Sequence, residues 1–238
     1  MSIPLSFILA LVLAVALIMA MLLDLKLLRD LRAANRRADS IARALRVMTD
    51  KLDFQTHHDT LTGLSNGAHF EAMLDATLQV RDSQPPGATD CNSLLYFDLD
   101  QFKAINDACG HAAGDELVKQ VAWRLRQLVR SGDTLARLDG DTFAALLPTC
   151  GPEDAQRRAD AIRTAIGDLR FHWDNRAFII SVSLGVLALD ETQNSSRLAL
   201  LAAERACRKA KDDGRNRVQL HTPDDPGPVR HPPGQRVA

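Results

Sequence analysis

Residues 134–147, TLARLDGDTFAALL, decide the fold of this chain through a tight turn at their centre. The Gly-Asp pair of the turn separates two short apolar runs, a pattern typical of a β-hairpin. Asp139, Asp141 and Thr142 gather at the tip, and a second acidic cluster, YFDLDQF, lies upstream at residues 96–102. The hairpin is therefore either a metal and phosphate site or one that has lost part of that chemistry.

The overall composition excludes some classes of function. The chain has 238 residues, 46% of them hydrophobic, and a formal net charge of −1. Because there is no basic excess, nucleic acid is not an expected partner. The cysteines have neither CxxC nor metal-site spacing, so they are read as reduced thiols of a cytosolic domain. They are Cys91, Cys109, Cys150 and Cys207.

The N-terminus carries a long apolar stretch. Residues 3–23 contain no charge, and a helix of that length crosses a hydrocarbon core of roughly 30 Å. A cleaved signal peptide is the alternative, but the start is not basic and the cleavage site is poor. Basic residues follow the stretch, which predicts a cytoplasmic C-terminal side. We expect residues 1–24 to be a single-pass anchor in the bacterial inner membrane.

Residues 25–53 are predicted to form a signalling helix. Apolar residues recur there at alternating intervals of four and three, which is a heptad seam. The seam predicts a parallel coiled-coil dimer, and a single amphipathic helix is the alternative. The seam positions are Leu27, Leu31, Ala34, Ala38, Ile41, Leu45, Met48 and Leu52.

Residues 54–221 alternate amphipathic helices with apolar strands, which indicates one α/β domain. Strands are expected at SLLYFDL, TLARL, TFAALL, AFIISVSLGVL and RVQLH, and helices at 67–80, 113–129, 152–169 and 196–213. The tail, residues 222–238, is rich in Pro and Gly and is predicted to be disordered.

Asp98 closes the strand SLLYFD, at the end where α/β sheets bind ligands. Only one of Asp98 and Asp100 is expected to face the site. Alone, a strand-end aspartate is more often a helix cap. Together with the hairpin residue Asp141, it predicts a site for Mg²⁺ or Mn²⁺ and a nucleotide phosphate.

Four segments in order then resemble the GGDEF domain of diguanylate cyclases. They are DTLTGLSN at 59–66, DLDQFKAINDACGHAAGDE at 98–116, RLDGDTF at 137–143 and AKDDGRNRV at 210–218. The resemblance implies a nucleotidyl-cyclase-like α+β sandwich, with a central, mainly antiparallel sheet flanked by helices. In that family each of two facing domains holds a metal-bound GTP, and the product is cyclic di-GMP.

The resemblance also assigns roles to individual residues. It makes Asp98 and Asp141 metal ligands, and Asp141 and Lys103 catalytic residues. Phosphate would be bound by the amides near Gln101 and Phe102, with Lys103, Lys211 and Arg215, and the guanine edge by Asn106 and Asp115. The alternatives are that Lys103 and Lys211 are merely solvated and that Asp115 is a charge at a helix N-terminus.

The hairpin departs from the family pattern Gly-Gly-(Asp/Glu)-Glu-Phe at two positions. Asp139 replaces the first glycine and adds negative charge where phosphate should lie. Thr142 replaces a glutamate that resembles a metal ligand in the family, and a hydroxyl is a far weaker ligand for Mg²⁺. The open alternative is that Asp139 itself serves as a ligand. Gly67 also departs, from an arginine.

Arg130 and Asp133 form an RxxD five residues before the pentad. It resembles the inhibitory site at which the family binds cyclic di-GMP, where arginine can form a fork with guanine O6 and N7. An ordinary surface pair is the alternative.

The favoured hypothesis is a membrane-anchored, homodimeric GGDEF-domain protein that binds GTP, cyclic di-GMP or both, with weak or absent cyclase activity. A protein partner for input or output is possible in this hypothesis. The alternative is an active diguanylate cyclase with RxxD product inhibition. A purely structural membrane oligomer is a third hypothesis, which leaves the convergent site unexplained.

Overall fold

The computed structural model describes residues 13, 17–26, 29, 41–49, 51, 54–82, 91–190 and 194–222. The chain divides into two compact units, residues 1–54 and 55–238. In the first unit, helical structure is described at 17–26 and 41–49. None of the described helices is both long and apolar enough to cross a membrane.

Most of the predicted anchor, much of the predicted heptad helix and the tail from residue 223 lie outside the described residues. Three seam residues are described: Ile41, Leu45 and Met48 are 60%, 62% and 64% exposed in the single chain. The coiled coil stays a prediction.

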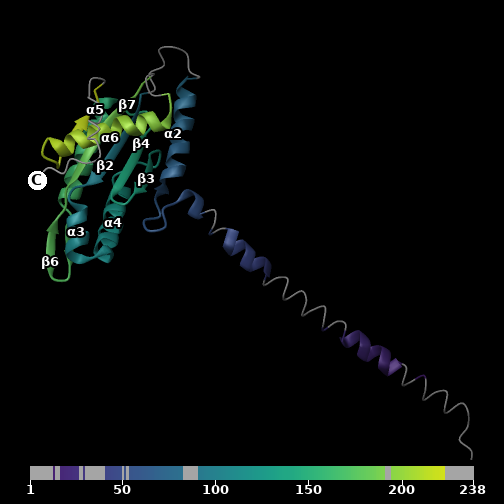
Figure 1. The fold of residues 1–238 in the computed structure, drawn as a ribbon. Helices are drawn as coiled ribbons and strands as arrows, with labels where there is room; N and C mark the ends of the chain where they lie inside the picture. The colour runs from purple at the N-terminus through teal and green to yellow at the C-terminus, as the bar shows by residue number, and fades with distance from the viewer. Residues whose placement is uncertain are drawn as a thin grey trace, which may run out of the picture. The chain divides into compact units, whose positions relative to one another are not determined.

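The second unit contains a six-stranded mixed sheet with helices on both faces (Figure 1). The strand order is β1-β3-β4-β2-β7-β8. The strands are β1 (Ser65–Asn66), β2 (Asn92–Leu99), β3 (Thr134–Asp139), β4 (Thr142–Leu147), β7 (Val182–Leu189) and β8 (Val218–Leu220). The pairs β1–β3 and β7–β8 are parallel, and β3–β4, β4–β2 and β2–β7 are antiparallel. The expected sheet with flanking helices is therefore present.

Five helices are described in this unit: α2 (Gly67–Asp82), α3 (Phe102–Cys109), α4 (His111–Arg126), α5 (Pro152–Gly167) and α6 (Ser196–Asp212). They start and end for local reasons. Pro152 and two acidic residues open α5, and Ser195 caps α6 by accepting from the backbone N–H of Leu198. Gly214, with φ of 115°, follows the end of α6 and turns the chain toward β8.

Alternation along β2 divides the interior into two cores. Leu95, Phe97 and Leu99 belong to the core that includes buried residues of α4 and α5. Leu94 and Tyr96 belong to the other, with buried residues of α2 and α6. Side chains two apart on a strand share a face, so the site residue Asp98 lies on the α6 side.

The predicted strand AFIISVSLGVL is in fact two strands. β6 (Arg176–Ile179) pairs with β5 (Arg170–Trp173) in a separate hairpin, and β7 begins at Val182. The extended run is interrupted between β6 and β7, where the Ser181 carbonyl accepts from the backbone N–H of Asp100 at 2.9 Å. Asp174 and Asn175 form the turn of this hairpin, and both have positive φ. Asp and Asn adopt positive φ more readily than most residues, so this pair is a turn signal in the sequence.

Candidate functional site

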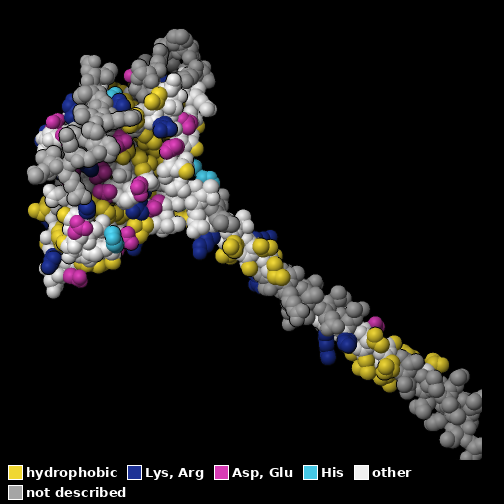
Figure 2. Space-filling view, viewed as in Figure 1, with side chains coloured by type: hydrophobic (Ala, Val, Ile, Leu, Met, Phe, Trp, Pro, Cys, Tyr) yellow, Lys and Arg dark blue, Asp and Glu magenta, His cyan; other side chains and the backbone are white. Residues whose placement is uncertain are grey.

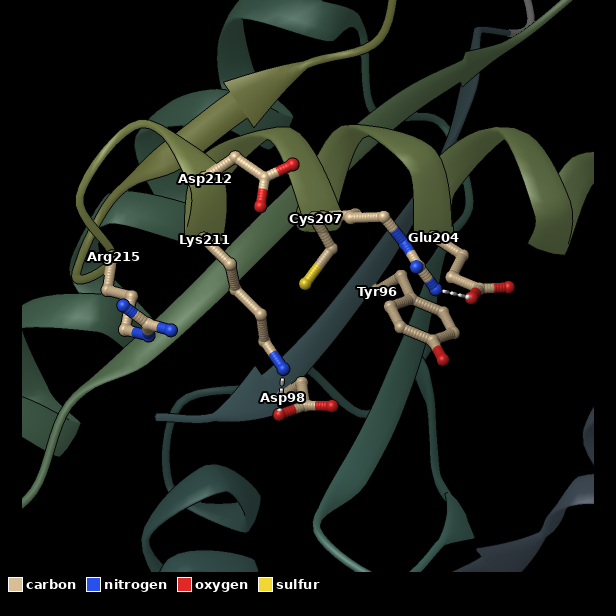
Figure 3. Close-up of a pocket in the computed structure, with 8 residues that line it drawn as sticks. Tyr96, Asp98, Glu204, Cys207, Lys211, Asp212 and Arg215 are labelled. Carbon is tan, nitrogen blue, oxygen red and sulfur yellow. Dashed lines mark hydrogen bonds and ion pairs between the residues drawn. The ribbon is translucent and has the colours of Figure 1, made fainter. Parts of the chain in front are cut away.

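Asp98 lies near the end of β2 and faces the last turns of α6 (Figure 3). The Lys211 Nζ donates to its Oδ1 at 2.5 Å, and the Thr142 Oγ1 lies 3.4 Å from its Oδ2. The ion pair is mostly shielded, with 31% and 18% of the two side chains exposed. Asp98 is thus the point at which β2, the hairpin and α6 meet.

Asp100 has a structural role, in line with the prediction that only one of Asp98 and Asp100 faces the site. It is 7% exposed and accepts from the hydroxyls of Ser181 and Ser183, each at 2.7 Å. It also accepts from the backbone N–H of Asn216 at 3.1 Å. These bonds fix the end of β2 and the segment after α6, which carries Arg215.

Asp141 supplies the second carboxylate. Burial raises the pKa of Asp141, the negative charge of Asp98 raises it further, and Lys211 opposes the shift. The backbone N–H of Leu99 donates to the Asp141 carbonyl at 3.3 Å and ties the hairpin to β2. Two carboxylates close enough for the charge of one to raise the pKa of the other are also suited to a cation.

Asp139 and Thr142 pair across the hairpin next to a register shift between Arg137 and Asp139. Asp139 is exposed, and its Oδ1 accepts from the Gly140 N–H at 2.8 Å. Its carboxylate is thus engaged within its own turn, which does not favour the alternative that it serves as a metal ligand. Among residues 91–190 and the other described parts, no group of three or more His, Cys, Asp or Glu is placed to hold a metal ion.

Arg137 connects the hairpin to the start of the domain. Its Nε and Nη2 donate to the Gly140 carbonyl at 2.8 and 2.7 Å. Its Nη1 donates to both carboxylate oxygens of Asp59, at 3.2 and 3.1 Å. Asp59 also accepts from the N–H and hydroxyl of Thr62. The turn that opens the domain is therefore bonded to the hairpin tip through one side chain.

A pocket of about 340 Å³ contains Asp98. Lys211 and Arg215, predicted from the sequence to bind phosphate, also line it, and five further lining residues were missed. These are Tyr96, Glu204, Cys207, Arg208 and Asp212. A signal for two of them existed, because positions 204, 208 and 211 are spaced 4 and 3 and so share one face of a helix.

The predicted phosphate-binding backbone follows β2 directly. Gln101 has a left-handed conformation, with φ of 58°, and α3 starts at the next residue. The first amides of a helix have no partner within the helix and can bind an anion. Lys103 is exposed on the first turn of α3.

Asn106 and Asp115, the expected guanine contacts, lie on the adjacent helices α3 and α4. The Asn106 Oδ1 is buried and, within the described part of the chain, has no hydrogen-bond partner. A buried acceptor without a donor is costly, so it marks a place where a ligand N–H would fit. Asp115 is exposed on the first part of α4.

Replacing Gly114 by alanine is expected to lower GTP affinity by about tenfold or more. A Cβ at this position would lie 2.0 Å from the Asn106 Oδ1 and 3.0 Å from the Phe102 Cζ, so Asn106 must rotate away. Calorimetric titration with GTP measures the effect. Gly151→Ala is the matched control, because its Cβ meets nothing within 4 Å. Equal GTP affinity of the two variants would show that Asn106 does not contact the nucleotide.

Arg130 and Asp133 lie outside this pocket, before β3. Arg130 is exposed, and its N–H donates to the Asp133 Oδ2 at 2.6 Å. The Asp133 side chain is 4% exposed and accepts from both Nη atoms of Arg158 on α5, with Nη1 at 3.2 Å. The bond to Asp133 raises the pKa of Arg158. Sequence reasoning missed Arg158 because the pairing spans distant segments.

Comparison with known proteins identifies the fold and its family. The family profile described as "Diguanylate cyclase, GGDEF domain" matches residues 56–217. The chain belongs to the GGDEF-domain family. The GGDEF domain is similar to "Probable diguanylate cyclase DgcE" of Escherichia coli, with 38% identity over 178 residues that cover 75% of this chain and 16% of DgcE.

Two further relatives support the assignment. "Diguanylate cyclase TpbB" of Pseudomonas aeruginosa is 37% identical over 177 residues, which cover 74% of this chain and 40% of TpbB. The crystal structure of the coiled coil and GGDEF domain of DgcB from Caulobacter crescentus, in complex with c-di-GMP, superposes with a TM-score of 0.68. It is 26% identical, covering 78% of this chain and 97% of that one. The chain thus spans less than half the length of DgcE and TpbB.

Proposed function

We propose that this chain is a GGDEF-domain protein of cyclic di-GMP signalling, with weak or absent cyclase activity. In this proposal it binds GTP in the Asp98 pocket and cyclic di-GMP at Arg130. The observation that carries the weak activity is the 3.4 Å contact between the Thr142 hydroxyl and Asp98. A neutral group lies where the family pattern has a carboxylate.

The carboxylates present fit a divalent cation in part. Asp98 and Asp141 would hold Mg²⁺ or Mn²⁺, which would neutralise phosphate charge during phosphoryl transfer. The negative charge of Asp98 raises the pKa of Asp141, and this closeness supports the assignment. Two carboxylates in place of three give weaker binding of a hard cation.

The other polar residues act on the nucleotide in this proposal. Lys211 leaves Asp98 to bind phosphate together with Arg215, and Lys103 with the amides at Gln101 and Phe102 holds the opposite side. Asn106 and Asp115 accept from the guanine N–H groups. Adenine would leave these acceptors unpaired, which gives selectivity for guanine.

An active cyclase is the second candidate. One observation favours it: despite the altered hairpin, Asp98 lies close enough to Asp141 to raise its pKa and accepts from the Lys211 Nζ at 2.5 Å. A domain that only binds cyclic di-GMP at Arg130 needs none of these residues.

Incubating the full chain with GTP and Mg²⁺, then Mn²⁺, and detecting cyclic di-GMP by mass spectrometry separates the two candidates. We expect GTP binding with product formation that is slow or below detection. Any product is expected to disappear in Asp141→Ala, because only one carboxylate then remains. Product formed equally fast by Asp141→Ala would refute the role of Asp141, and rapid product formation by the wild-type chain would favour the second candidate.

Arg130→Ala is expected to weaken cyclic di-GMP binding by about tenfold or more, because a guanidinium fork to guanine is lost. Calorimetry with cyclic di-GMP measures the change. Arg157→Ala is the control, since Arg157 is an exposed arginine of α5 paired with Asp154. Unchanged affinity in Arg130→Ala would show that this RxxD is an ordinary surface pair.

The membrane anchor and the homodimer remain proposals that rest on residues 3–23 and on the heptad seam. Together they would hold two GGDEF domains at the cytoplasmic face of the bacterial inner membrane. Input from a protein partner is part of the same proposal.

A further inference from the structure

Two of the four free cysteines meet just before the start of β2 and just after the end of β4. The Cys150 N–H donates to the Cys91 carbonyl at 2.6 Å. The Ser93 hydroxyl donates to the Cys150 carbonyl at 2.7 Å and forms a second bond between the two segments. Cys109, at the end of α3, and Cys207, within α6, belong to other elements. The backbones at Cys91 and Cys150 are therefore held side by side.

The side chains of this pair lie on the same face of the sheet. Leu95 faces the core with α4 and α5, and residues two apart on a strand share a face, so Cys91 is directed to the same side. Cys150 belongs to that core as well. The positive φ of 48° at Thr149 marks a bulge, which turns Cys150 to this face. Residues bonded across antiparallel strands have Cα atoms about 5.5 Å apart, within the range that a disulfide bridges.

The two thiols differ in their access to solvent. Cys91 is exposed, whereas Cys150 is 3% exposed. The Cys150 thiol lies near the Arg158 guanidinium: the bond to Asp133 raises the pKa of Arg158, burial opposes the rise, and the thiol adds to it. An exposed thiol meets an oxidant first, and a cation beside the second thiol can balance negative charge that develops on its sulfur. This is the arrangement of a reactive cysteine beside a resolving one.

We propose that Cys91 and Cys150 form a reversible oxidation site that closes as a disulfide when the chain meets hydrogen peroxide. First, the Cys91 sulfur bonds to one peroxide oxygen, the O–O bond breaks, and the other oxygen leaves as water with the thiol proton. The Cys150 sulfur then bonds to the Cys91 sulfur, the S–O bond breaks, and a second water leaves with the Cys150 proton. Two thiols are oxidised and one peroxide is reduced, and a thiol reductant restores both thiols.

The oxidation site is separate from the candidate nucleotide site. Cys91 precedes β2 and Asp98 lies near the other end of that strand, about 23 Å further along it. Cys150 is followed by Pro152, which opens α5. The disulfide would join the start of β2 to the start of α5 and close the chain between residues 91 and 150. It is expected to stabilise the folded domain without any nucleotide.

Mass spectrometry of the full chain tests the inference. The folded chain is treated with equimolar hydrogen peroxide, the remaining thiols are alkylated, and the chain is digested. We expect the loss of two hydrogens and a cross-linked peptide that contains Cys91 and Cys150, and dithiothreitol should reverse both. Cys91→Ser, at an exposed position, should abolish the cross-link, and the control Cys109→Ser should form it as wild type does. The oxidised wild-type chain should melt about 5 °C or more above the reduced chain.

The same treatment in concentrated urea shows whether the fold directs the pairing, because the cysteines of an unfolded chain pair without regard to native contacts. The inference is overturned if the folded chain gives no bond between Cys91 and Cys150, or if the bond joins two chains. It is also overturned if this pair is no more frequent among the cross-links of the folded chain than among those of the unfolded one.

Discussion

Combining Thr142→Glu with Asp139→Gly is expected to raise the rate of cyclic di-GMP formation by about 100-fold or more. The Thr142 Oγ1 already lies 3.4 Å from the Asp98 Oδ2, so a glutamate there adds a carboxylate beside Asp98. Removing the exposed Asp139 side chain also removes a negative charge next to the incoming phosphates. Initial rates with GTP and Mg²⁺, measured by mass spectrometry, give the result.

The matched control is Thr142→Gln with Asp139→Gly. Glutamine has nearly the size of glutamate but no charge, so its rate should stay close to that of Asp139→Gly alone. Equal rates for the glutamate and glutamine variants would mean that a missing carboxylate is not what limits this domain. The proposal of a degenerate hairpin would then be wrong.

Gly185→Ala is expected to lower the free energy of unfolding by about 3 kcal/mol. Gly185 lies in β7 against α6, and a Cβ there would lie 2.1 Å from the Ala203 carbonyl oxygen and 2.6 Å from the Cys207 N. Both atoms belong to the backbone of α6, so the helix itself must move. Since α6 carries Lys211, GTP affinity should fall as well.

Urea unfolding of the full chain measures the stability change, with calorimetry for GTP affinity. Gly132→Ala is the control, because its Cβ would meet nothing within 4 Å. A Gly185→Ala chain that unfolds within about 0.5 kcal/mol of wild type would show that β7 and α6 can separate without loss. Close packing of these two elements would then not fix the position of Lys211.

Sequence patterns predicted the elements whose signals are local. The hairpin turn, the apolar run of β2 and the Pro-Glu-Asp start of α5 each act over a few residues, and each is present. The short helix α3 was missed, because eight residues after a strand give little periodicity. The β5–β6 hairpin was missed because an apolar run was read as one strand, although Asp174-Asn175 marks the turn.

The same distinction between local and long-range signals applies to the residues of the candidate site. Asp98 follows from its place at the end of β2, and Lys211 and Arg215 follow from the last segment that resembles the family. The partners that fix these residues are distant in the chain. The Ser181 and Ser183 bonds to Asp100, and the Arg158 bond to Asp133, depend on tertiary packing that no local pattern encodes.

Figure 2 shows charged side chains of both signs scattered over the visible face of the GGDEF domain. Ion pairs between exposed side chains contribute little to folding stability, because solvent screens them. The pair of Arg137 and Asp59 differs, since 13% and 21% of their side chains are exposed. Burial would raise the pKa of Asp59, but the bonds from Thr62 and the charge of Arg137 together hold it below its usual value.

The Arg137 bonds join the start of the domain to the tip of the β3–β4 hairpin. The guanidinium holds the Gly140 carbonyl with two donors and Asp59 with a third, so the entry turn and the hairpin tip cannot shift independently. A rotation of the chain just before Asp59 would therefore displace the Gly140 peptide, which precedes Asp141. One side chain thus links the start of the domain to the peptide before Asp141, the residue proposed above as a metal ligand.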